Sequence, residues 1–255
     1  ITGGIGFAVI VNIREFCGQR ITRWITGVYK KVPRLTLNTR IILIGTAVLI
    51  ISGMFLFYAL EHGNSLRGRP LGVQYLSSLF QSVTLRTAGF NTVPFNGLTT
   101  TAYIVMTMFM FIGASSGSTA GGIKINSVVV MGSYVHSLLR NKDETIIANH
   151  SIPTEQVLKA FLILLFGILS VATGTIVLSL TEEARLSYIL FECVSAFGTV
   201  GLSAGITFDL SFIGKIMIII LMFIGRLGPL TILAAASTRE KKITISYPIA
   251  DIAIG

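Results

Sequence analysis

Apolar residues gather in long runs along this chain, and polar residues are confined to the stretches between them. The longest runs cover residues 41–60, 98–114, 160–180 and 212–224, and the first holds 20 residues without a charge. A helix needs about 20 apolar residues to cross a hydrocarbon core of roughly 30 Å. Composition agrees, because only 12% of residues are charged, against about 25% in soluble domains. The pattern predicts an all-α polytopic membrane protein.

Two shorter apolar segments, 75–86 and 187–197, each lead into a glycine-containing turn. Each is too short to cross a bilayer. Such a segment enters and turns back where protein or water satisfies the backbone that follows. Its negative C-terminal dipole end then faces the turn, which favours a cation there.

An internal repeat relates the two halves of the chain. The sequence Met-Phe-Ile-Gly at 110–113 returns at 222–225, and the same offset of 112 carries Thr-Ala-Gly-Phe at 87–90 onto Thr-Val-Gly-Leu at 199–202. Two motifs that share one offset indicate a duplicated unit. Each unit is predicted to contain a long helix (M1), a pore helix with a filter loop, and a second long helix (M2). Both units begin on the same side of the membrane, so the repeats are parallel.

The repeat sets the predicted domain boundaries. The glycine-rich start is typical of the inner half of an M2 helix, so we interpret the chain as the C-terminal half of a longer protein; a divergent N-terminal helix is the alternative. The predicted divisions are the end of a preceding M2 helix at 1–15, a cytoplasmic basic linker at 16–40, a third repeat at 41–140, a fourth repeat at 141–238 and a cytoplasmic tail at 239–255.

A net charge of +9 could indicate nucleic-acid binding. The positions of the basic residues along the chain decide whether it does. Thirteen basic residues lie between 14 and 40, between 140 and 159, and between 239 and 242, whereas the alternate loops hold four. This asymmetry follows the positive-inside rule, so the basic stretches are predicted to be cytoplasmic. Nucleic acid is therefore not an expected partner, and anionic membrane lipid is.

The two turns are typical of a selectivity filter. Backbone carbonyls replace the hydration shell of K⁺ in channel filters, whose loops contain a Thr-Val-Gly core. Residues 199–201 have that core, and residues 87–89 are a looser version of it. A glycine after a helix is also a common C-cap, but two such turns at equivalent repeat positions favour the filter. The predicted filter residues are Thr87, Ala88, Gly89, Phe90, Thr199, Val200, Gly201 and Leu202, with K⁺ bound by the carbonyls of Thr87, Ala88, Thr199 and Val200.

Residues 113–122 interrupt what would otherwise be one helix from 98 to 140. Four glycines and four Ser or Thr residues among these ten favour unwinding. A phosphate-binding loop does not fit, because the lysine is displaced by one residue from its required place. The alternatives are a plain helix kink and a flexible gate beneath the filter, and we prefer the gate. Its predicted residues are Gly113, Ala114, Ser115, Ser116, Gly117, Ser118, Thr119, Ala120, Gly121, Gly122, Lys124 and Arg226.

Three ionisable residues lie inside apolar segments, where such groups are costly and commonly functional. Arg226 directly follows the repeated Met-Phe-Ile-Gly motif, so it should face the same cavity as the loop; the alternative is a side chain that reaches the cytoplasmic surface. Arg86 ends the first pore helix, where its charge complements the helix dipole. Glu192 is either a buried hydrogen-bond acceptor or a source of negative potential, and both interpretations stay open.

Four stretches resemble the K⁺ transporters of the Trk/Ktr/HKT superfamily, in particular the C-terminal half of a bacterial Ktr membrane subunit. They are Thr-Leu-Arg-Thr-Ala-Gly-Phe-Asn-Thr at 84–92, the loop through Lys124, residues 197–203 and Gly-Arg-Leu-Gly-Pro at 225–229. The resemblance implies four M1–pore-loop–M2 units around one pore, with Gly89 and Gly201 as filter glycines. It also implies a homodimer in the bacterial plasma membrane and a cytoplasmic nucleotide-binding regulatory ring of the KtrA type, which would dock on basic surfaces such as 14–40 and 239–255.

The predicted function is therefore that of a K⁺-translocating pore subunit of a bacterial K⁺ uptake system. The alternative is a Na⁺-coupled alternating-access cation transporter, in which broken helices also occur, although inverted repeats and midplane acids are more usual there. Na⁺ as a coupling or activating ion stays open. An enzyme is not predicted, because the sequence offers no nucleophile–base pair or metal cluster.

Overall fold

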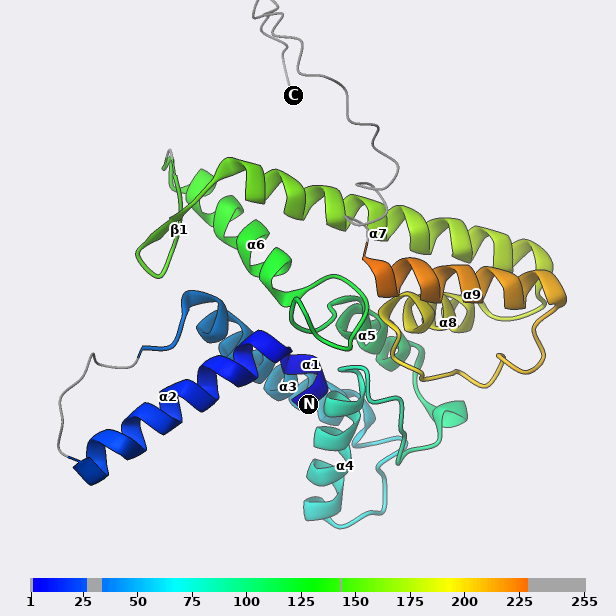
Figure 1. Cartoon of the computed structure of the whole chain (residues 1–255). Helices are drawn as coiled ribbons and strands as arrows, with labels where there is room; N and C mark the ends of the chain where they lie inside the picture. The colour runs from blue at the N-terminus through cyan, green and yellow to red at the C-terminus, as the bar shows by residue number, and fades with distance from the viewer. Residues whose placement is uncertain (1, 27–33, 143, 229–255) are drawn as a thin grey trace, which may run out of the picture.

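The computed structural model describes residues 2–26, 34–142 and 144–228, which fold mainly as helices (Figure 1). The predicted tail at 239–255 and part of the predicted basic linker lie outside the described residues. The helices and strands are α1 (Thr2–Ile5), α2 (Phe7–Thr26), α3 (Leu37–Glu61), α4 (Leu71–Thr84), the 3₁₀ turn η1 (Phe95–Gly97), α5 (Thr100–Phe111), α6 (Ile125–Leu139), β1 (Thr145–Ile147), β2 (His150–Ile152), α7 (Thr154–Thr181), α8 (Leu186–Gly198) and α9 (Phe212–Leu227).

Helices α3 and α7 are long and apolar enough to cross a membrane. They contain 25 and 28 residues with mean hydropathies of 2.4 and 2.5 in their most apolar windows. Only 17% and 22% of those windows is buried inside the protein, so most of their apolar side chains face outward. A contiguous apolar surface of this kind marks contact with lipid or with another chain.

Helices α4 and α8 are the predicted pore helices, and each is two residues longer than the sequence pattern indicates. The prediction that Arg86 ends the first of them is wrong, because α4 begins at Leu71 and ends at Thr84. They contain 14 and 13 residues, which gives lengths of about 20 Å at 1.5 Å per residue. Helix α4 packs against α3, and α8 packs between α5, α7 and α9. Ser82 on α4 donates a hydrogen bond to the carbonyl of Ile50 on α3 at 2.7 Å, which ties the short helix to the long one.

The repeat extends to the way that α5 and α9 begin. Thr99 and Ser211, which are 112 residues apart, are the N-caps of α5 and α9, and each side chain accepts a hydrogen bond from a backbone amide of the first turn. The amide and hydroxyl of Thr99 donate to Glu61 at the end of α3. Those of Ser211 donate to Glu182, which follows α7. In both units a carboxylate at the end of the first long helix therefore fixes the start of the second.

One apolar core joins the two units. Helix α5 of the first unit packs on α8 of the second, and aromatic side chains fill the contact. The rings of Tyr103 and Phe191 meet edge to face at 5.3 Å between centroids, and both side chains are almost fully buried. The pore helix of one unit is thus held by the M2 helix of the other.

A short hairpin between α6 and α7 is a β element that the all-α prediction does not include. Strands β1 and β2 pair antiparallel, with Ile147 opposite His150. The two residues between them, Ala148 and Asn149, have φ values of +45° and +65°, as a type I′ hairpin turn requires. The Thr-Ile-Ile sequence of β1 supplies β-branched residues that suit a strand. Each strand has only three residues, so an alternating pattern of apolar and polar residues could not be recognised in the sequence.

The N-terminal helix is broken once and then continues further than the sequence predicts. Gly6 has a φ of +91° and separates α1 from α2. Helix α2 then runs to Thr26, across the predicted boundary between residues 15 and 16. Asn12 on this helix accepts hydrogen bonds from the amide of Thr36 and the hydroxyl of Thr39, which connects α2 to the start of α3.

Candidate functional site: the Thr-x-Gly turns and the 113–122 loop

The two Thr-x-Gly turns, residues 87–90 and 199–202, have matching backbone geometry. Thr87 and Gly89 have φ values of +64° and +78°, and Thr199 and Gly201 have values of +51° and +87°. The residue between each pair does not share this sign. A left-handed conformation is uncommon for threonine because its branched side chain crowds the backbone. Its occurrence at both equivalent positions shows that the surrounding structure imposes it.

A hydroxyl group at the end of each pore helix fixes the turn that follows. The Thr84 hydroxyl accepts a hydrogen bond from the amide of Phe90 at 2.9 Å and donates to the carbonyl of the same residue. The Ser195 hydroxyl donates to the carbonyl of Leu202 at 2.6 Å. Phe90 and Leu202 are 112 residues apart, so both turns are fastened at the same place.

The two turns lie against each other through their glycines. A Cβ atom on Gly89 would lie 2.7 Å from the carbonyl oxygen of Val200, and one on Gly201 would lie 3.5 Å from the Cα of Gly89. Backbone therefore contacts backbone, and the Val200 carbonyl lies close to the first turn. The structure brings together the predicted filter residues of both units.

The loop at 113–122 begins and ends at the same point, where α5 stops and α6 follows. The amide of Gly113 donates to the carbonyl of Ile123 at 2.6 Å, and the amide of Ile123 donates to the carbonyl of Phe111 at 3.2 Å. The side chains of Ala114, Ser115 and Ala120 are buried, whereas Ser116, Gly117 and Thr119 at the tip are exposed. Ser118 donates a hydrogen bond to the carbonyl of Ser115 at 2.6 Å. The break falls where the sequence predicts it, and the loop is folded rather than extended.

The start of the chain holds one side of this loop. The amides of Ser115 and Thr119 donate to the carbonyls of Gly4 and Gly3 at 3.0 and 3.1 Å, and the amide of Phe7 donates to the carbonyl of Gly117 at 3.3 Å. A Cβ atom on Gly3 would lie 2.9 Å from the Thr119 hydroxyl. The glycine-rich N-terminal sequence therefore serves close backbone packing, a role that the sequence reasoning did not identify.

Arg86 also contacts the loop. The sequence reasoning assigned its charge to the helix dipole and did not predict this contact. Its side chain is 6% exposed, and its guanidinium donates to the carbonyl of Ile112 at 2.8 Å and to that of Gly113. The break leaves the carbonyls at the end of α5 without helical partners. Arg86 satisfies them. The position equivalent to Arg86 in the second unit is Gly198, and in that unit α9 is still helical at Gly225, the residue equivalent to Gly113, and ends at Leu227. The only available signal was this difference between the repeats.

The far side of the loop contacts the second Thr-x-Gly turn and α9. The amide of Gly121 donates to the Thr199 hydroxyl at 2.8 Å. Arg226 donates to the carbonyl of Thr119, so it faces the loop, as expected. Lys124 donates to the carbonyl of Ala120 within the loop itself.

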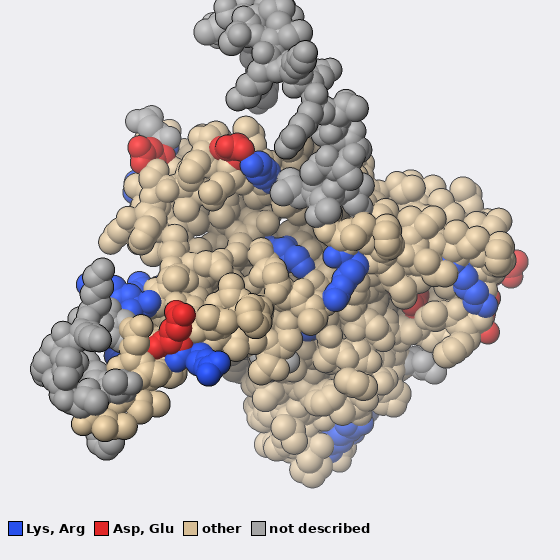
Figure 2. All heavy atoms as spheres, in the orientation of Figure 1, with Lys and Arg blue, Asp and Glu red and all other residues tan. Residues whose placement is uncertain are grey.

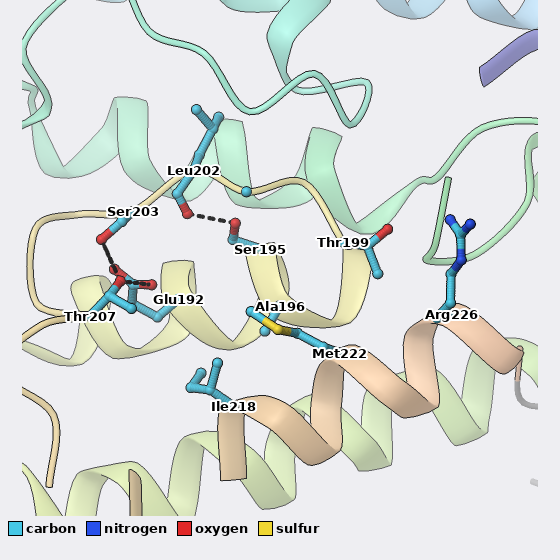
Figure 3. A pocket seen from close by; sticks show the side chains of 11 residues that line it. Glu192, Ser195, Ala196, Thr199, Leu202, Ser203, Thr207, Ile218, Met222 and Arg226 are labelled. Carbon is cyan, nitrogen blue, oxygen red and sulfur yellow. Dashed lines mark hydrogen bonds between the residues drawn. The ribbon is translucent and has the colours of Figure 1, made fainter. Parts of the chain in front are cut away.

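A cavity of about 480 Å³ lies between α8, the second turn and α9. Thr199 and Arg226 stand at one end of it, and Glu192, Ser203 and Thr207 stand at the other (Figure 3). Glu192 is 5% exposed and accepts hydrogen bonds from the Ser203 and Thr207 hydroxyls and the amide of Ala204. Of the two interpretations left open for Glu192, the acceptor role agrees with these bonds.

Charged side chains are sparse around the turns. In Figure 2, basic and acidic side chains gather near α2, and two separate basic patches lie in the otherwise uncharged middle of the face. Among the described residues, no group of three or more His, Cys, Asp or Glu side chains could hold a metal ion. The groups that contact the turns include the hydroxyls of Thr84 and Ser195 and the amide of Gly121.

Comparison with known proteins finds cation transport proteins. The sequence matches the TrkH family, described as cation transport protein, over residues 1–244. It is 36% identical to Ktr system potassium uptake protein B of Bacillus subtilis, over 100% of this chain and 55% of that protein. It is 35% identical to the potassium/sodium uptake protein NtpJ of Enterococcus hirae, over 97% of this chain and 53% of that protein.

A solved structure has a similar fold. The crystal structure of the potassium transporter TrkH from Vibrio parahaemolyticus superposes with a TM-score of 0.62 at 20% identity, over 90% of this chain and 51% of that chain. The chain spans about half the length of the relatives that it matches.

Proposed function

The chain belongs to the TrkH family of cation transport proteins, and on that premise we propose that it supplies two of the units around the pore of a bacterial K⁺ uptake system. The family consists of transporters, so the prediction that the chain is not an enzyme is confirmed. In the proposal, the two parallel units each contribute an M1 helix (α3 and α7), a pore helix (α4 and α8) and an M2 helix (α5 with α6, and α9).

The observation that carries the proposal is the paired Thr-x-Gly geometry. Both turns follow a helix too short to span, both place threonine and glycine at positive φ, and their backbones meet at Gly89 and Val200. In the proposal, alternating φ signs turn the carbonyls of Thr87, Ala88, Thr199 and Val200 toward one axis. A ring of carbonyl oxygens can then replace the hydration shell of K⁺.

The 113–122 loop is the proposed gate. Irregular backbone at membrane depth is tolerated only where it packs in protein or lines a water-filled path. The loop is compatible with both: its flanks are buried, and Ser116, Gly117 and Thr119 at its tip are exposed next to Arg226. A guanidinium beside a cation path lowers the local K⁺ occupancy, and here it also holds the loop closed through the Thr119 carbonyl.

The ion, the partners and the location follow from the relatives as proposals. One relative is named for potassium and another for potassium and sodium, so we propose K⁺ as the transported ion, with Na⁺ as a second transported or coupling ion. The whole protein is proposed to act in the bacterial plasma membrane as a homodimer with a cytoplasmic nucleotide-binding ring.

The filter is tested by placing side chains at its glycines. Gly201→Ser and Gly89→Ser should abolish the preference for K⁺ over Na⁺ in uptake by cells that lack other K⁺ transporters, because a side chain at φ near +80° strains the turn. Gly68→Ser is the matched control, since Gly68 also has a φ of +80° but has open space around it. Unchanged ion preference in both filter variants would refute the filter.

The gate is tested by shortening it. Deletion of residues 116–119, or Arg226→Ala, should raise K⁺ flux in proteoliposomes, because each removes a contact that holds the loop beneath the filter. Unchanged or reduced flux in folded protein would count against the gate. Single-channel recordings of the same protein in a planar bilayer separate the pore from the Na⁺-coupled alternating-access alternative. The alternative would give carrier-like rates without single-channel steps.

A further inference from the structure

Each end of the 113–122 loop forms hydrogen bonds at one of the Thr-x-Gly turns. The proposed function assigns no role to these contacts. The first end is held by the residue directly before the first turn, and the second end is held by a residue inside the second turn. The two contacts come from different units, and each involves the side chain of one residue and the backbone of the loop.

At the first end, Arg86 reaches the loop from the short turn between α4 and the first Thr-x-Gly turn. Its guanidinium donates to the carbonyls of Ile112 and Gly113, while its backbone continues into Thr87. A guanidinium is rigid and planar, so bonds to two neighbouring carbonyls fix its position closely. A shift of the loop at Gly113 must therefore either break these bonds or move the residue that begins the first turn.

At the second end, the contact runs directly to a turn residue. The amide of Gly121 donates to the Thr199 hydroxyl at 2.8 Å. A Cβ atom on Gly121 would lie 2.8 Å from both the Oγ1 and the Cγ2 of Thr199. Loop and turn are thus in close contact, and Thr199 is one of the two threonines held at positive φ.

We propose that Arg86 and Thr199 are positioning residues that couple the loop to the two turns, so that the loop cannot leave the pore without releasing the filter. One part of this inference rests on the proposed function: that the preference for K⁺ over Na⁺ depends on the position of the loop. The other part, that Arg86 and Thr199 hold the loop in place, can be measured without ion transport.

A thiol probe reports the loop position directly. In the full-length protein with Cys17→Ser, which removes the exposed cysteine, Ser115→Cys places a near-isosteric thiol at a fully buried loop position. Thr199→Val keeps the side-chain shape and removes the acceptor. We expect the labelling rate of the new thiol to rise about three- to tenfold, as the loss of one net hydrogen bond implies. Thr199→Ser should restore the parent rate.

Thr87→Val is the matched control, because Thr87 occupies the equivalent turn position but has no described hydrogen bond to the loop. Its labelling rate should equal that of the parent. Arg86→Lys tests the other end: a lysine keeps the charge but cannot bond both carbonyls in a fork, so labelling should again increase. Equal labelling in all variants would overturn the coupling, as would an equal rise in Thr87→Val and Thr199→Val.

Ion preference then tests the consequence. The K⁺ over Na⁺ uptake ratio should fall in Thr199→Val and in Arg86→Lys and should be retained in Thr199→Ser. Faster labelling with an unchanged ratio would show that the loop is fastened to the turns without influencing them, which overturns the proposal. A parent protein that takes up no cation would instead refute the proposed function, while its labelling rates would still report the contacts.

Discussion

Gly225 is the position where the structure leaves least room for any side chain. A Cβ atom there would lie 1.8 Å from the carbonyl oxygen and 2.6 Å from the carbonyl carbon of Phe197, at the end of α8. Cβ atoms essentially never approach other atoms within 3.0 Å, so Gly225→Ala must separate α9 from the end of the pore helix by more than 1 Å. The obstacle is backbone, which cannot rotate away.

The expected cost follows from this geometry. Overpacking of a core costs about 1–3 kcal/mol, and a clash with backbone belongs at the upper end. Alanine is favoured over glycine inside a helix by about 1 kcal/mol, so the net destabilisation should be about 2 kcal/mol. For a cooperative unit of about 150–250 residues that corresponds to a decrease in Tm of roughly 4–8 °C, and for a longer unit to a smaller decrease.

Two other glycines make the measurement a graded series. At Gly174 the nearest atom is the end of the flexible Leu221 side chain, at 2.6 Å, and at Gly132 in α6 nothing lies within 4 Å. Thermal unfolding of the purified full-length protein in detergent should rank Gly132→Ala as slightly more stable than the parent, Gly174→Ala as close to it, and Gly225→Ala as clearly less stable. A Tm for Gly225→Ala equal to that of Gly132→Ala would refute the close packing.

The carboxylates at the ends of α3 and α7 give the remaining predictions. Glu61 is fully buried and accepts four hydrogen bonds, two of them from Thr99, so Glu61→Gln should destabilise the protein by about 1–3 kcal/mol, measured against the exposed control Glu183→Gln. Partial burial acts to raise the pKa of Glu182, but hydrogen bonds from Ser211 outweigh it and hold that pKa below its usual value. The cap is therefore intact above the ordinary carboxyl pKa and is lost as pH falls through the lowered one, so protection of the Ser211 amide against exchange should be lost only below the ordinary glutamate pKa of about 4.3. A Glu182→Gln variant that shows the same loss of protection over this pH range would contradict the assignment to Glu182.

The arrangement of the helices was predictable because it depends on local patterns. The offset of 112 located both Thr-x-Gly turns, and the structure extends it to the starts of α5 and α9, where Thr99 and Ser211 are the caps. The break at 113–122 was visible from its glycine content. Length alone distinguished the pore helices from the spanning ones.

The contacts of the loop were not predictable, because they join residues that are distant in the sequence. Arg86 lies 26 residues before Ile112, and Gly4 lies 111 residues before Ser115. The sequence shows the dipole of the helix that Arg86 ends, but it does not show which carbonyls lie within reach. The positive φ of Thr87 and Thr199 is hidden for a related reason: threonine has no intrinsic preference for it, so tertiary contacts impose it.

The two units differ where their second long helices pass the repeated Met-Phe-Ile-Gly motif. Helix α5 ends at Phe111 and the loop begins at Gly113, whereas the equivalent Gly225 is still helical and α9 ends at Leu227. Gly225 also lies directly against the backbone of Phe197. We therefore expect the two units to contribute unequally to any opening of the pore, with movement at Gly113 in the first unit and a stationary wall at Gly225 in the second.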